Sequence, residues 1–258
     1  MTAPGDPILL EECCDGGFWH ARIDRPNANI LDKSVVLSLT EVFSRARENP
    51  DLKAVCVSGV GDHFSFGASV EEHQPEQVAG MLSTFHRMFR TMADTPVTLL
   101  AAVRGQCLGG GLELASFCHR VFASQDAKLG QPEIQLGVIA PVASVILRER
   151  VGSAAAEDLC ITGRILGAQD AHTIGLVDEL VDDPAQAAFR YFEEHLQRHS
   201  ASSLRFALRA VRRGFYERFV AELQTIEELY LEELQSTHDA VEGIQAFLEK
   251  RKPQWSNS

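Results

Sequence analysis

Short apolar runs alternate with amphipathic helical segments through the first two thirds of the chain, and this alternation limits the fold more than any other feature. Residues 54–59 and 97–103 are apolar runs of strand length. Residues 34–46 and 77–92 instead carry apolar side chains at steps of three and four, the spacing of one helix face. Strands and helices in this order predict βαβ units built around a mostly parallel sheet.

The two ends of the chain depart from this alternation. Residues 8–10 and 18–23 flank a turn-forming Asp15-Gly16-Gly17 sequence, which predicts a β-hairpin. After Pro184 the pattern is helical to the C-terminus. One apolar stripe in this region steps by three and four residues: Phe219, Leu223, Ile226, Tyr230 and Leu234. We therefore expect an α/β core over residues 1–183 and a helical region over residues 184–258.

Composition excludes several classes of protein. Hydrophobic residues make up 45% of the 258 residues and charged residues 23%, which rules out a disordered or fibrous chain. The 24 Lys and Arg residues are outnumbered by 36 Asp and Glu residues, giving a net charge of −12. A general nucleic-acid or anionic-membrane surface would need clustered positive charge, so we expect neither partner.

The sequence also predicts a cytoplasmic protein. The N-terminus has neither the basic nor the apolar region of a secretory signal, and no apolar run approaches the ~18 residues that span a bilayer. The six cysteines are scattered among apolar neighbours, without the two matching Cys/His pairs typical of zinc sites. We expect them to be reduced and mostly buried thiols, and we expect no metal site.

Two glycine-containing segments follow predicted strands. Residues 63–69 include small side chains that would let a ligand approach the backbone, although an ordinary turn would look the same. Gly105 to Ala115 contains Gly109-Gly110-Gly111 at the start of a predicted helix, where free N–H groups suit an oxyanion or another anion. The glycine spacing is neither the dinucleotide fingerprint nor a phosphate loop, and close approach of another backbone would also explain it.

Two carboxylates lie in apolar surroundings near these segments. Glu113 is flanked by leucine, alanine and phenylalanine, and Glu133 lies between apolar groups in residues 129–134. An unpaired charge would be costly in either place. A structural ion pair would account for each acid taken alone. Two such acids close to glycine-rich turns favour a general acid/base pair.

Other residues carry weaker signals. His119 could act as a base, but a single histidine is more often a hydrogen-bonded core or rim residue. The methionine and phenylalanine stripe of residues 81–92 is more typical of a helix packed in the core than of a cofactor pocket. A basic cluster from Arg205 to Arg213 could contact phosphate groups or simply face solvent.

Taken in order, these segments resemble the crotonase superfamily of enoyl-CoA hydratases and isomerases. The resemblance covers nearly the whole chain and begins at Arg25-Pro26-Asn27-Ala28. The other matching segments are Phe66-Gly67-Ala68, Gly105 to Ala115, Phe122-Ala123, residues 129–133, Leu136-Gly137, Thr162-Gly163-Arg164 and residues 168–177. So many matches in one order are specific to the superfamily.

The resemblance implies both a fold and a site. The fold would be a spiral of ββα units with C-terminal helices that build a homotrimer, often paired into a homohexamer, and close the active site. The N–H groups of Ala68 and Gly110 match the oxyanion hole for a thioester carbonyl, and Glu113 and Glu133 match both catalytic glutamates of the hydratases. CoA would enter as part of an acyl-CoA thioester substrate, with no separate cofactor.

We place the remaining substrate contacts on the segments that match the family's pocket. These residues are Arg25, Phe66, Gly67, Ser69, Gly109, Pro132, Ala140 and Pro141. Because the chain is acidic, its contacts with the CoA phosphates should be local, and Arg25 and the Arg205–Arg213 cluster are our candidates.

Departures from the family pattern narrow the expected substrate. Val138 to Ser144 replaces a glycine-rich stretch, while Ser69 and His119 each replace a frequent aspartate. With residues 64–73 and Ala140-Pro141, the pattern resembles the family's hydratases of cyclic dienoyl-CoA thioesters. It implies addition of water to cyclohexa-1,5-diene-1-carbonyl-CoA, giving 6-hydroxycyclohex-1-ene-1-carbonyl-CoA, in anaerobic benzoyl-CoA degradation. The alternatives are a general enoyl-CoA hydratase or isomerase, a ring-opening hydrolase of the superfamily, and a non-catalytic or RNA-binding member.

Overall fold

The computed structural model describes residues 5–26 and 28–258. Asn27 of the first matching segment, and residues 1–4 of the N-terminus considered for a signal sequence, lie outside the described residues. Among the described helices, none combines the length and the apolar character that crossing a membrane requires.

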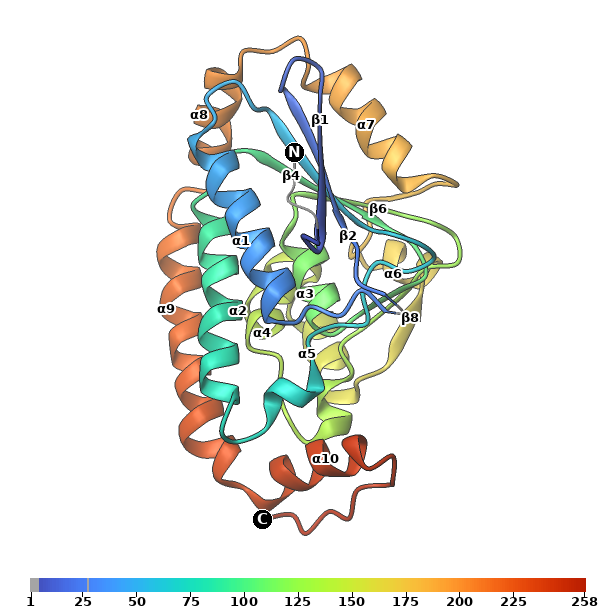
Figure 1. Cartoon of the computed structure of the whole chain (residues 1–258), viewed down its shortest axis with the longest axis vertical. Coiled ribbons are helices and arrows are strands. Elements are labelled where there is room, and N and C mark those ends of the chain that lie inside the picture. The colour runs from blue at the N-terminus through green and yellow to red at the C-terminus, as the bar shows by residue number, and fades with distance from the viewer. Residues whose placement is uncertain (1–4, 27) are drawn as a thin grey trace.

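A six-stranded sheet forms the centre of the molecule (Figure 1). Its strands are β1 (Ile8–Cys13), β2 (Phe18–Ile23), β3 (Ala54–Gly59), β4 (Thr98–Val103), β6 (Arg120–Ala123) and β9 (Glu179–Leu180), in that spatial order. β1 and β2 are antiparallel, and all other neighbours are parallel. The predicted hairpin and the predicted mostly parallel sheet are both confirmed.

A second, three-stranded sheet lies beside the first and supports the spiral. It contains β5 (Gln106–Leu108), β7 (Lys128–Gly130) and β8 (Ile165–Gly167). Successive turns of the chain add one strand to each sheet and then a helix: β4 and β5 precede α3 (Gly110–Phe117), and β6 and β7 precede α4 (Pro141–Val151). The predicted spiral of ββα units is confirmed.

Helices cover both faces of the large sheet because successive strand residues point to opposite sides. On one face, side chains such as Val55, Val57 and Leu99 pack in a common core with α1 (Lys33–Glu48) and α2 (Val78–Ala93). On the other face, alternate residues such as Cys56 and Leu100 pack against α7 (Pro184–His195). The helical region predicted from residue 184 thus begins with a helix that belongs to the core of the sheet.

The remaining elements complete the helical layers and the base of the molecule. They are α5 (Ser153–Thr162), α6 (Ala168–Thr173), α8 (Ala201–Val211), α9 (Phe215–Glu228), α10 (His238–Leu248), and the short turns η1 (Val70–His73), η2 (Pro132–Leu136), η3 (Leu229–Glu233) and η4 (Leu234–Ser236). α9 runs along α2 and α4, with Phe219 and Leu223 of the predicted stripe buried. α10 contacts η1 and η2 at the base (Figure 1).

Candidate active site

A cavity of about 80 Å³ lies where α2, α3, η2 and the loop after β3 meet. Both predicted glutamates and the predicted oxyanion residues line it. The structure brings ten of the predicted site residues to this cavity: Phe66, Gly67, Ala68, Gly109, Gly110, Glu113, Pro132, Glu133, Ala140 and Pro141. Segments separated by about seventy residues of sequence therefore converge on one small volume, which we call the acyl cavity.

Glu113 is held in the acyl cavity by the beginning of another helix. Its side chain belongs to α3 and is almost fully buried, with the residue only 3% exposed. The Ala143 N–H, in the first turn of α4, donates a 2.8 Å hydrogen bond to Glu113 Oε1. Pro141 starts α4, where the absence of an N–H costs nothing. The helix N-terminus thus stabilises a carboxylate that is otherwise removed from water.

Glu133 faces the same cavity from η2, with less support. Its Oε2 atom is buried and has no hydrogen-bond partner among the described residues. Its Oε1 atom lies against the backbone of Gly109, where an added Cβ would stand 2.5 Å from it. A carboxylate oxygen that faces a cavity without an internal partner is available to bind a water molecule or a substrate proton.

The surroundings of both glutamates favour their protonated forms. Burial raises the pKa of Glu113, and the N–H groups of Ala143 and Val142 oppose this effect. Burial also raises the pKa of Glu133, and the charge of Glu113 raises it further. Two interacting acids lose their protons in steps that belong to the pair. The pair can therefore hold one proton while keeping one carboxylate free, which suits general acid/base catalysis.

Two backbone N–H groups beside the glutamates form a site for a developing negative charge. The Ala68 and Gly110 N–H groups have no acceptor within the described chain. They are close neighbours, since a Cβ added at Gly110 would stand 3.1 Å from the Ala68 nitrogen. Gly110 is the first residue of α3, so its N–H also lies at the positive end of a helix. This arrangement has the components of an oxyanion hole.

Hydrogen bonds from outside the cavity hold the loop that carries Ala68. Ser65 donates a 2.7 Å hydrogen bond to the Asn29 carbonyl, and its Oγ accepts the Gly67 N–H at 3.0 Å. The Asn29 side chain in turn donates to the carbonyls of Val60 and His63. Ser65 is therefore a structural residue of the loop.

A larger groove of about 630 Å³ adjoins the acyl cavity. The two share the residues Phe66, Ala68, Val70, Pro132 and Leu136. Ser69 lines this groove and does not line the acyl cavity itself. The groove is large enough for an extended arm that would reach the acyl cavity from the protein surface.

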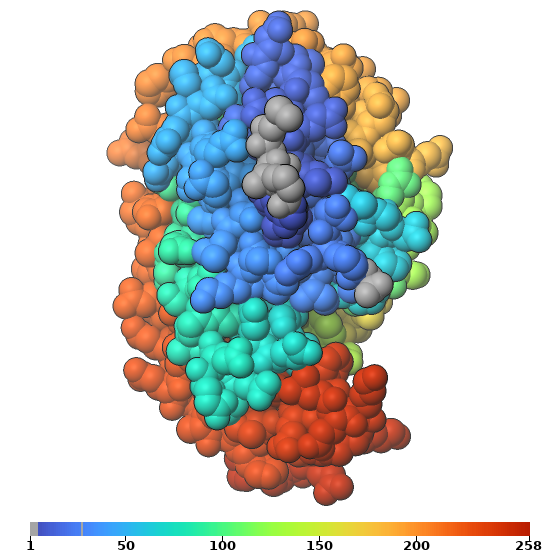
Figure 2. All heavy atoms as spheres, in the orientation of Figure 1, coloured from blue at the N-terminus to red at the C-terminus, as the bar shows by residue number. Residues whose placement is uncertain are grey.

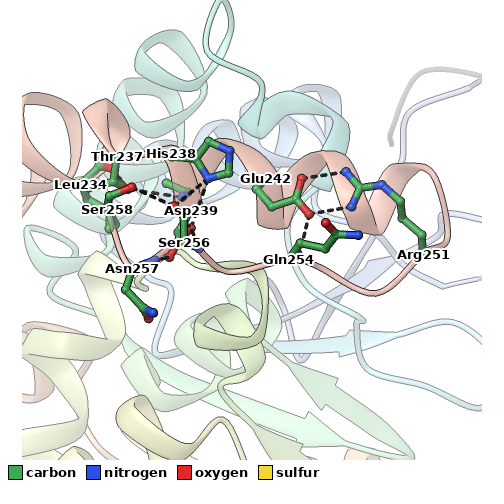
Figure 3. Close-up of polar contacts among 11 residues, drawn as sticks. Leu234, Thr237, His238, Asp239, Glu242, Arg251, Gln254, Ser256, Asn257 and Ser258 are labelled. Carbon is green, nitrogen blue, oxygen red and sulfur yellow. Dashed lines mark hydrogen bonds and ion pairs between the residues drawn. The ribbon is translucent and has the colours of Figure 1, made fainter.

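The last ten residues of the sequence fold back along α10 and support one wall of the groove. Arg251 binds Glu242 through two hydrogen bonds of 2.6 and 2.7 Å, and the carboxylate of Asp239 accepts the N–H groups of Ser256 and Asn257 (Figure 3). Trp255 lies over Gly137 and Gly243, next to η2. Figure 2 shows this segment, in red, at the base of the molecule.

The basic residues predicted to meet CoA phosphates lie elsewhere. Arg25 forms a 2.6 Å ion pair with Asp32 and lines neither the acyl cavity nor the groove. Arg205 donates to the carbonyls of Ala46 and Arg47 and so caps the end of α1. The rest of the Arg205–Arg213 cluster also lines neither cavity. The structure does not bring these arginines to the site.

Sequence reasoning did not predict that apolar residues of α2 form part of the cavity wall. Met88 and Met92 pack in the core, as the stripe of residues 81–92 predicts. Met81, Leu82 and Phe85 of the same stripe also line the acyl cavity. Periodicity identifies the buried face of a helix but carries no signal that separates core from cavity wall.

Comparisons with known proteins agree with this geometry. The family model for enoyl-CoA hydratase/isomerase matches residues 15–258. The chain belongs to this family. A curated relative, the cyclohexa-1,5-dienecarbonyl-CoA hydratase of Thauera aromatica, is 52% identical over 257 residues and covers 100% of both chains. A probable enoyl-CoA hydratase of Mycobacterium bovis is 34% identical over 98% of both chains.

Solved structures of the enoyl-CoA hydratase/isomerase family have the same fold. An enoyl-CoA hydratase/isomerase from Pseudoalteromonas atlantica matches with a TM-score of 0.84 at 25% identity, over 97% of this chain and 100% of that one. An enoyl-CoA hydratase from Bacillus anthracis matches with a TM-score of 0.77 at 27% identity, over 98% and 100%. The C-terminal helices are included in both matches.

The contact between Gly109 and Glu133 predicts a sharp difference between two glycine substitutions. Gly109 has a φ of +52°, and an added Cβ would stand 2.5 Å from Glu133 Oε1. Gly109→Ala should therefore lower the free energy of unfolding by about 1–3 kcal/mol. Gly80→Ala, in the helix α2 with nothing near the added Cβ, should raise it by about 0.5–1 kcal/mol. Urea unfolding of both variants measures the two effects, and a stable Gly109→Ala protein would contradict the packing described.

The raised pKa of Glu133 predicts a pH-dependent gain in stability when its charge is removed. The folded protein binds this proton more tightly than the unfolded chain, so its stability falls as the pH rises from the ordinary glutamate value of 4.5 through the raised value. Glu133→Gln should therefore be more stable than the parent protein by on the order of 1 kcal/mol at high pH, and equally stable below about pH 4. Urea unfolding across pH tests this. Glu41→Gln on the exposed face of α1 is the control and should show no such trend.

Proposed function

We propose that this protein is a hydratase that adds water to cyclohexa-1,5-diene-1-carbonyl-CoA. The reaction type is supported by the pair Glu113 and Glu133, which face one cavity beside two free N–H groups. The substrate is supported by the 52% identity with the Thauera aromatica cyclohexa-1,5-dienecarbonyl-CoA hydratase across the whole chain. The probable enoyl-CoA hydratase of Mycobacterium bovis reaches only 34%.

The oxyanion site makes the conjugated thioester electrophilic. When the thioester oxygen accepts the N–H groups of Ala68 and Gly110, electron density that moves onto that oxygen is stabilised. Each donor of this kind is worth roughly 3 kcal/mol of transition-state stabilisation in comparable sites. The ring carbon β to the carbonyl then becomes the position at which a water oxygen adds.

The proposed product determines where the proton must go. The water oxygen bonds to ring carbon 2, water loses a proton to one glutamate, and the electron pair moves through the thioester to give a dienolate. The other glutamate donates its proton to ring carbon 5, at the far end of the diene, which leaves a double bond between carbons 6 and 1. Renumbered, this is 6-hydroxycyclohex-1-ene-1-carbonyl-CoA. We assign the two proton transfers to Glu113 and Glu133 as a pair.

The apolar wall of the acyl cavity supports a cyclic acyl group. Leu82, Phe85, Val138 and Ile139 line the cavity together with the polar groups. A ring in contact with these apolar side chains would displace water from them, and its conjugated carbons would lie within the cavity that the two glutamates line. The adjoining groove would accommodate the pantetheine arm of CoA.

The proposal also covers the cofactor, the cellular compartment and the oligomeric state of the enzyme. No redox or group-carrier step occurs in the reaction, so we propose no separate cofactor, with CoA present only as part of the substrate. We further propose that the protein works in the cytoplasm, in anaerobic benzoyl-CoA degradation, and assembles as a homotrimer or a homohexamer through its C-terminal helices. Exposed apolar residues of α8, Phe206 at 64% and Val211 at 86%, support an assembly surface there.

A comparison of two substrates tests the proposed activity. Purified protein should hydrate cyclohexa-1,5-diene-1-carbonyl-CoA with a kcat/KM at least tenfold higher than for crotonyl-CoA. Loss of dienoyl absorbance and the product mass measure the reaction. A preference for crotonyl-CoA would replace the proposal with a general enoyl-CoA hydratase. A protein that leaves the diene unchanged, and opens instead the ring of a cyclic acyl-CoA thioester that carries a ring ketone, would be a hydrolase.

Substitution of each glutamate tests the acid/base pair. Glu113→Gln and Glu133→Gln should each lower kcat by about 10²–10⁴-fold, because the amide neither accepts nor donates the transferred proton. Glu41→Gln on α1 is the matched control and should keep the parental kcat. Near-parental turnover in either active-site variant would remove that residue from the mechanism, provided that circular dichroism shows an unchanged fold.

A further inference from the structure

A second cavity, of about 350 Å³, lies between α3, α4 and the turn that joins α8 to α9. It shares no lining residue with the acyl cavity or the adjoining groove. Its lining includes one carboxylate, Glu149, and the thiol of Cys118. The other polar side chains are hydrogen-bond donors: Ser116, His119, Arg150, Arg212, Arg213 and Arg218. We call it the arginine cavity.

Two buried donors in the arginine cavity have no acceptor in the described part of the chain. Ser116 is 3% exposed, and its Oγ has no hydrogen-bond partner. The Leu99 N–H donates to Nδ1 of His119 at 2.8 Å, so Nε2 of a neutral His119 ring carries the hydrogen. That Nε2 is also buried without a partner. A buried donor left unsatisfied costs about 1–3 kcal/mol, which favours an acceptor in this cavity.

The positive charge of the arginine cavity is only partly neutralised by the chain. Arg150 is paired with Asp178, and Arg218 forms a 3.2 Å ion pair with Glu149. Arg212 forms no ion pair with a described residue. Its guanidinium stacks over Phe215 at 4.8 Å, and burial lowers the pKa of Arg212 to about 10. A guanidinium held in this way without a carboxylate is a strong donor to an anion.

The start of α9 adds a further positive contribution. This 14-residue helix begins at Phe215, a residue of the cavity wall, and the preceding Gly214 provides no side-chain cap. The Phe215 N–H donates to the Arg212 carbonyl, so the contribution of this end is the helix dipole, which favours a negative charge nearby. Three features therefore point to the same type of ligand, namely the two unsatisfied donors and the arginine without an ion pair, and the dipole of α9 adds to them.

We propose that the arginine cavity binds an oxyanion group, a phosphate or a carboxylate, through Arg212, the Nε2–H of His119 and the hydroxyl of Ser116. The group has two possible sources: a free anion such as inorganic phosphate, or a carboxylate from a second copy of this chain. The chain carries 36 Asp and Glu residues that could supply it. Val211, at the cavity wall, is 86% exposed in the single chain and belongs to the surface that we propose for assembly, so a second copy would meet the cavity there. A free anion would reach the cavity wherever that surface is not covered.

Thermal unfolding with inorganic phosphate tests the site. Phosphate is titrated into the full-length protein while sodium chloride is reduced to hold the ionic strength constant. A ligand that binds only the folded state raises the unfolding temperature in a saturable way. We expect such a rise in the parent protein and in Arg209→Gln, a control in α8 that lies three residues before Arg212 and does not line the cavity. Arg212→Gln should bind phosphate at least tenfold more weakly. An equal response in Arg212→Gln would overturn the proposal.

A second variant keeps the site testable if Arg212→Gln fails to fold, since that substitution also removes the stacking over Phe215. In His119→Asp, the new carboxylate can accept the Leu99 N–H and bring a negative charge to Arg212. This variant should unfold at a higher temperature than the parent protein in chloride alone and should no longer respond to phosphate. A lower unfolding temperature combined with a parental phosphate response would contradict the site.

Sedimentation velocity distinguishes the two sources. If the site binds a free anion, phosphate raises the unfolding temperature and leaves the sedimentation coefficient unchanged. If a carboxylate of a second copy occupies the site, both added phosphate and Arg212→Gln shift the protein toward smaller species, whereas Arg209→Gln does not. If phosphate changes neither quantity and Arg212→Gln sediments like the parent protein, the arginine cavity is not an oxyanion site.

Discussion

Close packing around Gly109-Gly110-Gly111 is the constraint on which the site depends. Each glycine meets a different part of the chain: Gly109 the carboxylate of Glu133, Gly110 the Ala68 nitrogen and the ring of Phe85, and Gly111 the side chain of Ser65. An added Cβ at any of these positions would stand within 3 Å of a neighbour. The low helix propensity of glycine is therefore offset by contacts that only a bare backbone can make.

The acyl cavity and the arginine cavity both contain polar groups that lack partners within the described chain. The charge of Glu113 is stabilised by the first turn of α4, whereas Glu133 has one oxygen without a partner among the described residues. The arginine cavity has the opposite imbalance, because its donors outnumber the acceptors around them. In both places the folded chain leaves polar groups without partners, which lowers the stability of the fold and leaves those groups able to bind a ligand. The ligands are water and a proton at the glutamates, and an anion in the arginine cavity. Binding energy at such sites is supplied by interactions that the chain leaves incomplete.

The periodicity of the sequence was sufficient to predict the mostly parallel sheet and the helical C-terminal region, whereas the spiral was implied only by the resemblance to the crotonase superfamily. The glutamates could be identified because a charged residue in an apolar segment needs an explanation, but only the fold shows that Glu113 and Glu133 face one cavity. Arg205 could not be interpreted, since its acceptors are carbonyls at the end of α1, more than 150 residues earlier. Long-range contacts of this kind leave no pattern within a single sequence.

The backward fold of residues 249–258 links the far end of the sequence to the acyl cavity. Trp255 packs beside Gly137 and Gly243, and so secures α10 against the turn that carries Glu133. The Trp255–Gly137 contact closes a long loop of sequence, which costs chain entropy. The position of one glutamate therefore depends on the last residues of the chain, whereas the oxyanion loop is held by hydrogen bonds of its own.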